Sequence, residues 1–273
     1  MPGRRTDRGL APGLMLLGVV VWSWAWWSVA ALTGQGWLTF PTVLLSLAGA
    51  LGPLVVPALL LWSGYGDESP GAFLRRCFDP RTLPLRWYAG LAMLLLVFAL
   101  VPVLLARGLA GLSPEPAGPV AFLLVGIAVG AIEEPAWRGY ALPGLQRRMP
   151  VIAASLAVGA VWSVWHLPLF FLEGTYQQSL GVGTTEFWLF LAGPVAIAPV
   201  YGWLHNVTGG VVFAAVVLHG MGNASRELWD PGAPLLQLGF EALLALTLTA
   251  VAWRWMSRPA PARSPAAGTG SPR

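Results

Sequence analysis

Six polar side chains fall inside long apolar stretches of this chain, and their types could do chemistry. They are Glu133, Glu134, Arg138, His166, His219 and Asn223. An ionisable group in hydrocarbon is costly unless it is paired or hydrated, so each titratable one is a functional hypothesis by default. Two others, His205 at a predicted loop and Glu241 near the start of a later apolar stretch, are interpreted as structural.

The two adjacent carboxylates are expected to do different jobs. Glu134 and Arg138 are four residues apart, so on a helix they share a face and can pair. Glu133 is rotated by about 100° from Glu134 and is free to point elsewhere. It is either a spare carboxylate beside a buried ion pair or a group that moves protons. Pro135 lacks a backbone donor and crowds the Ala131 carbonyl, which predicts a local kink that admits water.

The histidines lie on two further apolar stretches. Pro168 follows His166 by two residues and is predicted to loosen the next turn and leave space beside the imidazole. His219 and Asn223 are four residues apart and present two hydrogen-bonding groups on one helical face. Taken singly, each is more simply a satisfied core residue than a functional one.

The elements that must position these residues are transmembrane helices. The chain has 273 residues, 56% of them hydrophobic and 10% charged, with a mean hydropathy of +0.66. This composition excludes an ordinary water-soluble enzyme. Apolar stretches long enough to span a bilayer recur about eight times. We place them near 12–33, 41–62, 87–107, 119–143, 151–172, 185–204, 208–225 and 233–256. The predicted fold class is all-α, a polytopic helical bundle with its site within the bilayer.

The distribution of arginine predicts the orientation. Every basic residue is Arg, and most precede the first span, lie between the second and third, or follow the fourth and the eighth. The positive-inside rule then predicts a multi-pass protein of the plasma membrane, with both termini in the cytoplasm. The net charge of +4 is no indication of nucleic-acid binding, because no basic stripe interleaves with aromatic residues.

Several smaller features complete the organisation. The 12–33 stretch is longer than a signal-peptide core and rich in Trp, so we interpret it as a retained helix. Pro70–Phe78 is predicted to form a short interfacial helix, and Cys77, the only cysteine, cannot form an internal disulfide. Residues 1–256 are predicted to form a single transmembrane domain, and 257–273 a disordered cytoplasmic tail.

Three motifs occur in order on three separate spans. They are Glu133-Glu134-x-x-x-Arg138, Trp162-x-x-x-His166 and His219-x-x-x-Asn223. Together they resemble the CPBP family, the CAAX-prenyl-protease and bacteriocin-processing intramembrane proteases, also called Abi. The resemblance covers about 119–225 and departs at Trp162, where many members have Phe and an aromatic ring is kept.

The resemblance implies a membrane endopeptidase acting on a peptide or a membrane-protein substrate. The implied catalytic residues are a general base with its helper (Glu133, His166), two oxyanion donors (His219, Asn223) and an orienting pair (Glu134, Arg138). Two His and a carboxylate could ligate zinc, but the HExxH spacing is absent and Asn is a poor zinc ligand. We therefore favour catalysis without a cofactor, with zinc as the alternative.

Two other classes of protein remain open from the sequence. A proton-coupled transporter would use the paired carboxylates as a relay, although no repeat symmetry relates the two halves of the chain. A non-proteolytic immunity or scaffold protein would keep the motifs for packing alone. The natural substrate is not predicted.

Overall fold

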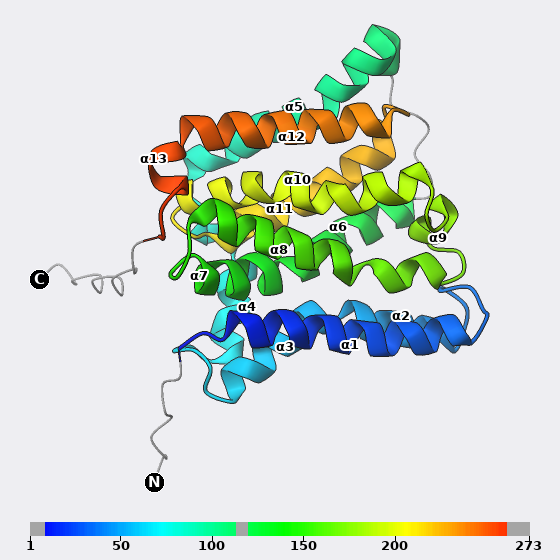
Figure 1. The fold of residues 1–273 in the computed structure, drawn as a ribbon, viewed down its shortest axis with the longest axis horizontal. Coiled ribbons are helices and arrows are strands. Elements are labelled where there is room, and N and C mark those ends of the chain that lie inside the picture. The colour runs from blue at the N-terminus through cyan, green and yellow to red at the C-terminus, as the bar shows by residue number, and fades with distance from the viewer. Residues whose placement is uncertain (1–8, 113–119, 261–273) are drawn as a thin grey trace, which may run out of the picture.

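The structure of the chain, a computed structural model, describes residues 9–112 and 120–260. The secondary-structure elements of this part are helices joined by loops (Figure 1). The first half comprises α1 (Pro12–Leu32), α2 (Thr42–Ala50), α3 (Gly52–Trp62), α4 (Pro70–Phe78), η1 (Pro80–Thr82), α5 (Leu85–Arg107) and η2 (Gly108–Leu112). The second half comprises α6 (Val120–Glu134), η3 (Pro135–Ala141), α7 (Leu142–Leu145), α8 (Val151–Trp165), η4 (Leu167–Phe171), α9 (Tyr176–Leu180), α10 (Thr185–Val207), α11 (Val212–Leu228), α12 (Pro234–Val251) and α13 (Trp253–Met256). The predicted all-α class is confirmed.

Among the described residues, five helical segments are long and apolar enough to cross a membrane: α1, α5 with η2, α8 with η4, α10 and α12. The pair α2 and α3 passes the same test only together, as one span bent by 53°. The remaining predicted spans, 119–143 and 208–225, correspond to the interrupted helix α6–η3–α7 and to α11, which carry most of the motif residues. A multi-pass helical bundle is therefore confirmed. The number of membrane spans reaches the predicted eight only if these two segments also cross the membrane.

The bend between α2 and α3 is stabilised by α1. Pro53 has no N–H for the carbonyl of Gly49, which is its helical partner one turn earlier. The Ser23 hydroxyl donates to that carbonyl at 2.7 Å, and the Trp22 indole donates to the neighbouring Ala48 carbonyl at 2.8 Å. Side chains of α1 thus satisfy the backbone groups that the break exposes, as buried polar groups require.

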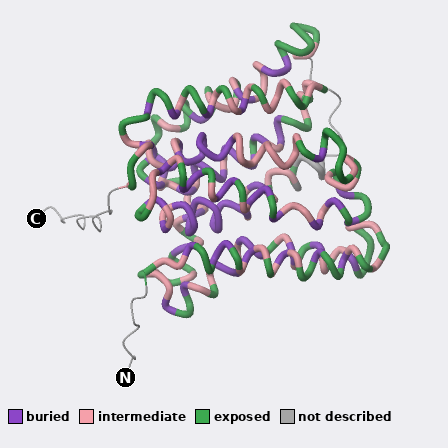
Figure 2. The backbone as a smooth tube through the Cα atoms, viewed as in Figure 1, coloured by how far each residue is buried: buried purple, intermediate pink, exposed green. Residues whose placement is uncertain are grey.

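The helices are arranged in layers with the motif helices in the middle. Figure 1 shows α1, α2 and α3 along one side, α5 and α12 along the other, and α6, α8, α10 and α11 between them. The most extensive contacts join α11 with α6, and α10 with both α8 and α12. Buried residues gather in this middle layer (Figure 2), so the motif residues lie in the best-packed part of the bundle.

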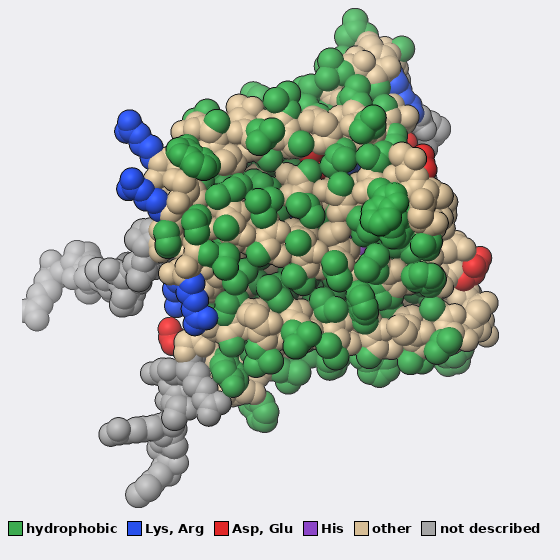
Figure 3. Space-filling model, viewed as in Figure 1, with side chains coloured by type: hydrophobic (Ala, Val, Ile, Leu, Met, Phe, Trp, Pro, Cys, Tyr) green, Lys and Arg blue, Asp and Glu red, His purple; other side chains and the backbone are tan. Residues whose placement is uncertain are grey.

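The two ends of the bundle differ in charge. The start of α1 and the helices α4, α7 and α13 lie at one end, and most basic side chains visible in Figure 3 gather there. Between the ends, the visible face is largely apolar, as a surface facing lipid should be. Having α1 begin where α13 ends fits the predicted even number of spans. The cytoplasmic placement of this end stays a prediction.

The predicted interfacial helix forms over the expected residues as α4. The Ser69 hydroxyl accepts a hydrogen bond from the Ala72 N–H and caps its first turn. Its apolar face buries Phe73 and Cys77 against η3, where a Cβ on Gly139 would lie 3.1 Å from the Phe73 ring. Helix α4 therefore packs directly against η3, which carries Arg138 of the first motif.

Other residues singled out from the sequence are placed as follows. His205 is buried in the last turn of α10, so its predicted loop position is wrong, because the helix continues to Val207. Glu241 is buried and accepts hydrogen bonds from Arg226 at 2.7 Å and Gln237 at 2.9 Å, which fits its structural interpretation. Of the predicted tail, only 257–260 fall within the described residues, where the Ala260 N–H donates to the Gln146 carbonyl.

Candidate active site

The first motif spans a change of helix type. Pro135 cannot donate to the Ala131 carbonyl, and the chain passes from α6 into the π-helical segment η3. In this segment the Leu142 N–H reaches back to the Trp137 carbonyl, five residues earlier. All residues of η3 are buried. The predicted distortion at Pro135 takes the form of a wide turn of helix, which is frequent at functional sites, and the entry of water there stays a prediction.

Glu134 is the centre of a buried charge cluster. Its Oε1 accepts hydrogen bonds from Arg138 Nη1 at 2.9 Å and from His219 Nδ1 at 2.8 Å. The Glu134 side chain is 0% exposed and that of Arg138 is 1% exposed. The predicted pairing within the motif is therefore present, and it is joined by a histidine 85 residues further along the chain.

Glu133, the neighbouring carboxylate, is held by two indoles. Trp162 Nε1 donates to its Oε2 at 2.6 Å, and Trp137 Nε1 donates to the same oxygen at 3.3 Å. Neither bond uses the other oxygen, Oε1. The Glu133 residue is 3% exposed, so this carboxylate is fixed by neutral donors in an apolar setting. The two adjacent carboxylates thus have different environments, as the sequence predicts.

The end of α8 orients His166. Pro168 has no N–H for the Val164 carbonyl, and the helix tightens into η4. The His166 N–H then turns back to the Ser163 carbonyl at 3.2 Å. The Trp162 carbonyl instead pairs with the His166 ring, at 2.8 Å from Nδ1. Because a carbonyl only accepts, Nδ1 must carry the proton, and the neutral ring presents a lone pair at Nε2.

Two aromatic rings pack against the His166 imidazole. The ring of Trp165 lies 4.8 Å from it and that of Phe190 lies 5.3 Å away, both edge to face. The predicted loosening after Pro168 is wrong, because the following turn tightens into a 3-10 helix. His166 remains half-buried, so part of the ring stays accessible.

Glycines bring the third motif against the first. A Cβ on Gly130 of α6 would lie 2.9 Å from the Gly220 backbone nitrogen, so the two helices meet almost backbone to backbone. This approach places His219 of α11 against Glu134 of the neighbouring α6. One turn further along α11, Asn223 Nδ2 donates to the Gly126 carbonyl at 3.0 Å. That bond uses one N–H of the amide and leaves the other.

Aromatic rings fill the space between the motif helices. The Arg138 guanidinium lies 3.8 Å from the ring centroid of Tyr201 and 4.7 Å from that of Trp162. The Trp162 ring also lies 5.0 Å from the ring of His219 and 6.2 Å from that of His166. Trp162 therefore connects the carboxylate, the arginine and both motif histidines.

Four of the six predicted site residues thus contact Trp162, and Glu134 bonds to two of these, Arg138 and His219. Asn223 lies one turn from His219 against α6. Tyr201 and Trp137 were missed from the sequence. Tyr201 lies near the end of the predicted span 185–204, where tyrosine is common at the membrane interface, so the sequence gives no distinct signal for it. Trp137 gives none either, since tryptophan is common throughout this chain.

The histidines and carboxylates of the site that could hold a metal are already engaged in hydrogen bonds. Within 9–112 and 120–260, no three His, Cys, Asp or Glu side chains gather in an arrangement suited to a metal ion. The Nδ1 atoms of His166 and His219 are both engaged, so a metal would have to be bound at Nε2. Metal dependence remains a prediction for experiment.

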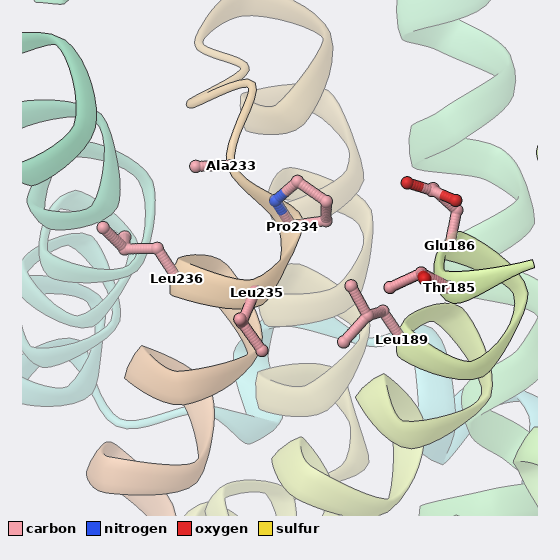
Figure 4. A pocket seen from close by; sticks show the side chains of 7 residues that line it. All are labelled: Thr185, Glu186, Leu189, Ala233, Pro234, Leu235 and Leu236. Atoms are coloured by element: carbon pink, nitrogen blue, oxygen red, sulfur yellow. The ribbon is translucent and has the colours of Figure 1, made fainter.

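An open groove lies elsewhere on the molecule, between the first turns of α10 and α12 (Figure 4). Its volume is about 520 Å³. Its lining residues are Thr185, Glu186, Leu189, Ala233, Pro234, Leu235 and Leu236. None of the motif residues lines it, so it is separate from the candidate site.

Comparison with known proteins agrees with the geometry. Residues 115–225 match the family model described as type II CAAX prenyl endopeptidase Rce1-like. This segment contains all three motifs and nearly coincides with the predicted core of about 119–225. The chain is also 27% identical over 219 residues to CAAX prenyl protease 2 of Methanococcus maripaludis, a match that covers 74% of this chain and 79% of the relative. The matched segment, this relative and the three ordered motifs together support the resemblance to the CPBP family of CAAX-type membrane proteases.

Proposed function

We propose that the chain is an intramembrane endopeptidase in which Glu133 activates the attacking water. The observation that carries this proposal is the different environment of two adjacent carboxylates. Glu134 is committed to Arg138 and His219, whereas Glu133 Oε1 takes no part in the two indole bonds of its carboxylate. A base held in place with one oxygen outside those bonds suits general base catalysis.

The proposed reaction is the hydrolysis of a peptide bond. Glu133 takes a proton from water, and the resulting hydroxide adds to the carbonyl carbon of the substrate. The Nε2 lone pair of His166 assists by accepting a hydrogen bond from the same water. When the tetrahedral intermediate collapses, the C–N bond breaks and the leaving amine takes the proton from Glu133. The carboxylate is then restored for the next cycle.

Two donors are proposed to stabilise the oxyanion. Asn223 offers the second N–H of its amide, and His219 offers Nε2–H. His219 already donates through Nδ1 to Glu134, so it can donate through Nε2 only as an imidazolium. In that state Arg138 and His219 balance the charges of Glu133 and Glu134. Oxyanion donors of this kind typically contribute about 3–4 kcal/mol each to lowering the barrier.

The substrate class is a peptide or a membrane protein that reaches the site from the bilayer. The relative from Methanococcus maripaludis is named a CAAX prenyl protease, which suggests the first probe. This probe is an internally quenched peptide ending in Cys-a-a-X, with and without a farnesyl group on the cysteine. Cleavage of only the farnesylated form would assign prenyl recognition, and cleavage of both would assign a broader peptidase.

The test is the Glu133→Gln variant of the purified protein in detergent or liposomes. Glutamine keeps the shape and the indole bonds but cannot take a proton, so kcat should fall by about 10²- to 10⁴-fold. Glu173→Gln is the matched control, because Glu173 is an exposed carboxylate bonded only to the nearby Gln178 among the described residues. Unchanged cleavage in Glu133→Gln would refute the proposal. Substrate transport without cleavage would favour the transporter instead.

A further inference from the structure

The end of α8 has a second unusual carbonyl, that of Trp165. In a continued α-helix it would accept from the N–H of Leu169. The tightening at Pro168 sends that N–H to the His166 carbonyl instead, at 3.0 Å. The Trp165 carbonyl is then taken by the indole of Trp24, whose Nε1 donates to it at 3.2 Å. A helix 141 residues earlier in the chain therefore supplies the donor that α8 lacks.

Ring contacts make the same connection between α1 and the site. The Trp27 ring lies 4.7 Å from the Trp165 ring, and its Nε1 donates to the Ser46 carbonyl of α2 at 3.0 Å. Trp165 in turn lies 5.9 Å from Trp137, which is one of the two donors to Glu133. A continuous series of packed indoles thus runs from α2 to the carboxylate.

His166 depends on this turn because it is the C-cap of α8 and follows Trp165 directly. Its Nδ1–H bond to the Trp162 carbonyl fixes which nitrogen is protonated and where Nε2 points. That bond survives only while the last turn keeps its tightened form. Trp24 secures the turn through the Trp165 carbonyl, which the tightening leaves without its helical partner.

We propose that Trp24 is a positioning residue of the site, which holds the last turn of α8 and thereby sets the orientation and tautomer of His166. The effect of Trp24 on catalysis rests on the proposed function. It gives α1, which lies outside the matched segment 115–225, a role in the chemistry beyond membrane anchoring. Trp24 touches no reacting atom and acts only through Trp165 and His166.

The first test compares Trp24→Phe with Trp22→Phe. Both changes remove one indole N–H from half-buried positions of α1, but Trp22 donates to the Ala48 carbonyl of α2 instead of to α8. Loss of one hydrogen bond to the site should lower kcat of Trp24→Phe about 3- to 10-fold, with KM within about twofold of the wild type. Trp22→Phe should keep the wild-type kcat. Equal kcat values in the two variants would overturn the proposal.

The second test needs no proteolysis. Nitrogen-15 NMR of the histidine rings distinguishes a ring protonated at Nδ1 from one protonated at Nε2, and a His166→Gln sample identifies the signal. The wild type should show His166 protonated at Nδ1, and Trp24→Phe should show a mixture of tautomers. An unchanged His166 signal in Trp24→Phe refutes the positioning role, whether or not the protein cleaves peptides. Absence of cleavage by the wild type refutes the proposed function separately.

A shape-preserving replacement covers the possibility that Trp24→Phe does not fold. β-(3-Benzothienyl)alanine at position 24 keeps the size of the indole and replaces its N–H with sulfur. It should reproduce the fall in kcat and the mixed tautomers of His166, since only the hydrogen bond is lost. Wild-type behaviour of this variant would show that Trp24 contributes by packing alone and would overturn the proposal.

Discussion

Replacing Arg138 by alanine should destabilise the protein as well as inactivate it. Arg138 is 1% exposed and bonds to Glu134, which is 0% exposed. Removing one partner of a buried ion pair typically costs about 3–5 kcal/mol, because the other charge stays buried without compensation. His219 still donates to Glu134, which favours the lower part of this range. The lost contacts with Trp162 and Tyr201 add about 1–2 kcal/mol for each ring.

A double-mutant cycle separates these contributions. Arg138→Ala, Glu134→Gln and the double variant are unfolded in mixed micelles, and the free energy of unfolding is measured for each. The double variant no longer buries an uncompensated charge, so it should be more stable than the sum of the single changes predicts, by about 1–3 kcal/mol. The ring contacts of Arg138 cancel in this comparison. Additive losses would refute the view that the two side chains form a coupled buried pair.

Three further predictions concern the thiol, the orientation and the metal. Burial raises the pKa of Cys77 to about 12, so maleimide should label the native protein only slowly at pH 8, and rapid labelling would contradict this burial. Any stability that comes from burying the neutral thiol should be lost as the pH rises from 9 toward 12. An impermeant thiol reagent applied outside cells should label cysteines placed in 173–185 but not one placed at Arg75, and the reverse pattern would overturn the predicted orientation. Chelators should leave cleavage unchanged, whereas stoichiometric zinc required for turnover would make the His166 and His219 Nε2 atoms ligand candidates.

The parts of the site that could be predicted are local in the chain. The pairing of Glu134 with Arg138 follows from a four-residue spacing on one helix, and the break at Pro135 follows from the missing N–H. The different directions of the two carboxylates also follow from helix geometry, because neighbouring residues are about 100° apart. The short helix Pro70–Phe78 was predicted with its correct ends, and in the structure it begins with Ser69 as N-cap and Pro70 in the first turn.

The parts that could not be predicted depend on which helices meet. The bond from Trp162 to Glu133 joins residues 29 apart, and that from His219 to Glu134 joins residues 85 apart. No spacing within one segment encodes such contacts. The Arg138 contact with Tyr201 depends in the same way on the packing of α10 in the middle layer. The turn after His166 was predicted to loosen, but Pro168 is followed by a tighter 3-10 turn.

Prolines explain why polar chemistry can exist in so apolar a bundle. Each proline in a helix leaves the carbonyl one turn earlier without its donor, and hydrocarbon offers no water in its place. At Pro53 a serine of α1 supplies the donor, at Pro135 the helix widens, and at Pro168 the His166 ring and an indole of α1 satisfy the carbonyls of the tightened turn. The side chains of the first two motifs emerge at the second and third of these breaks. Their orientation therefore depends on backbone groups that must be satisfied, and α1 supplies one of the donors through Trp24.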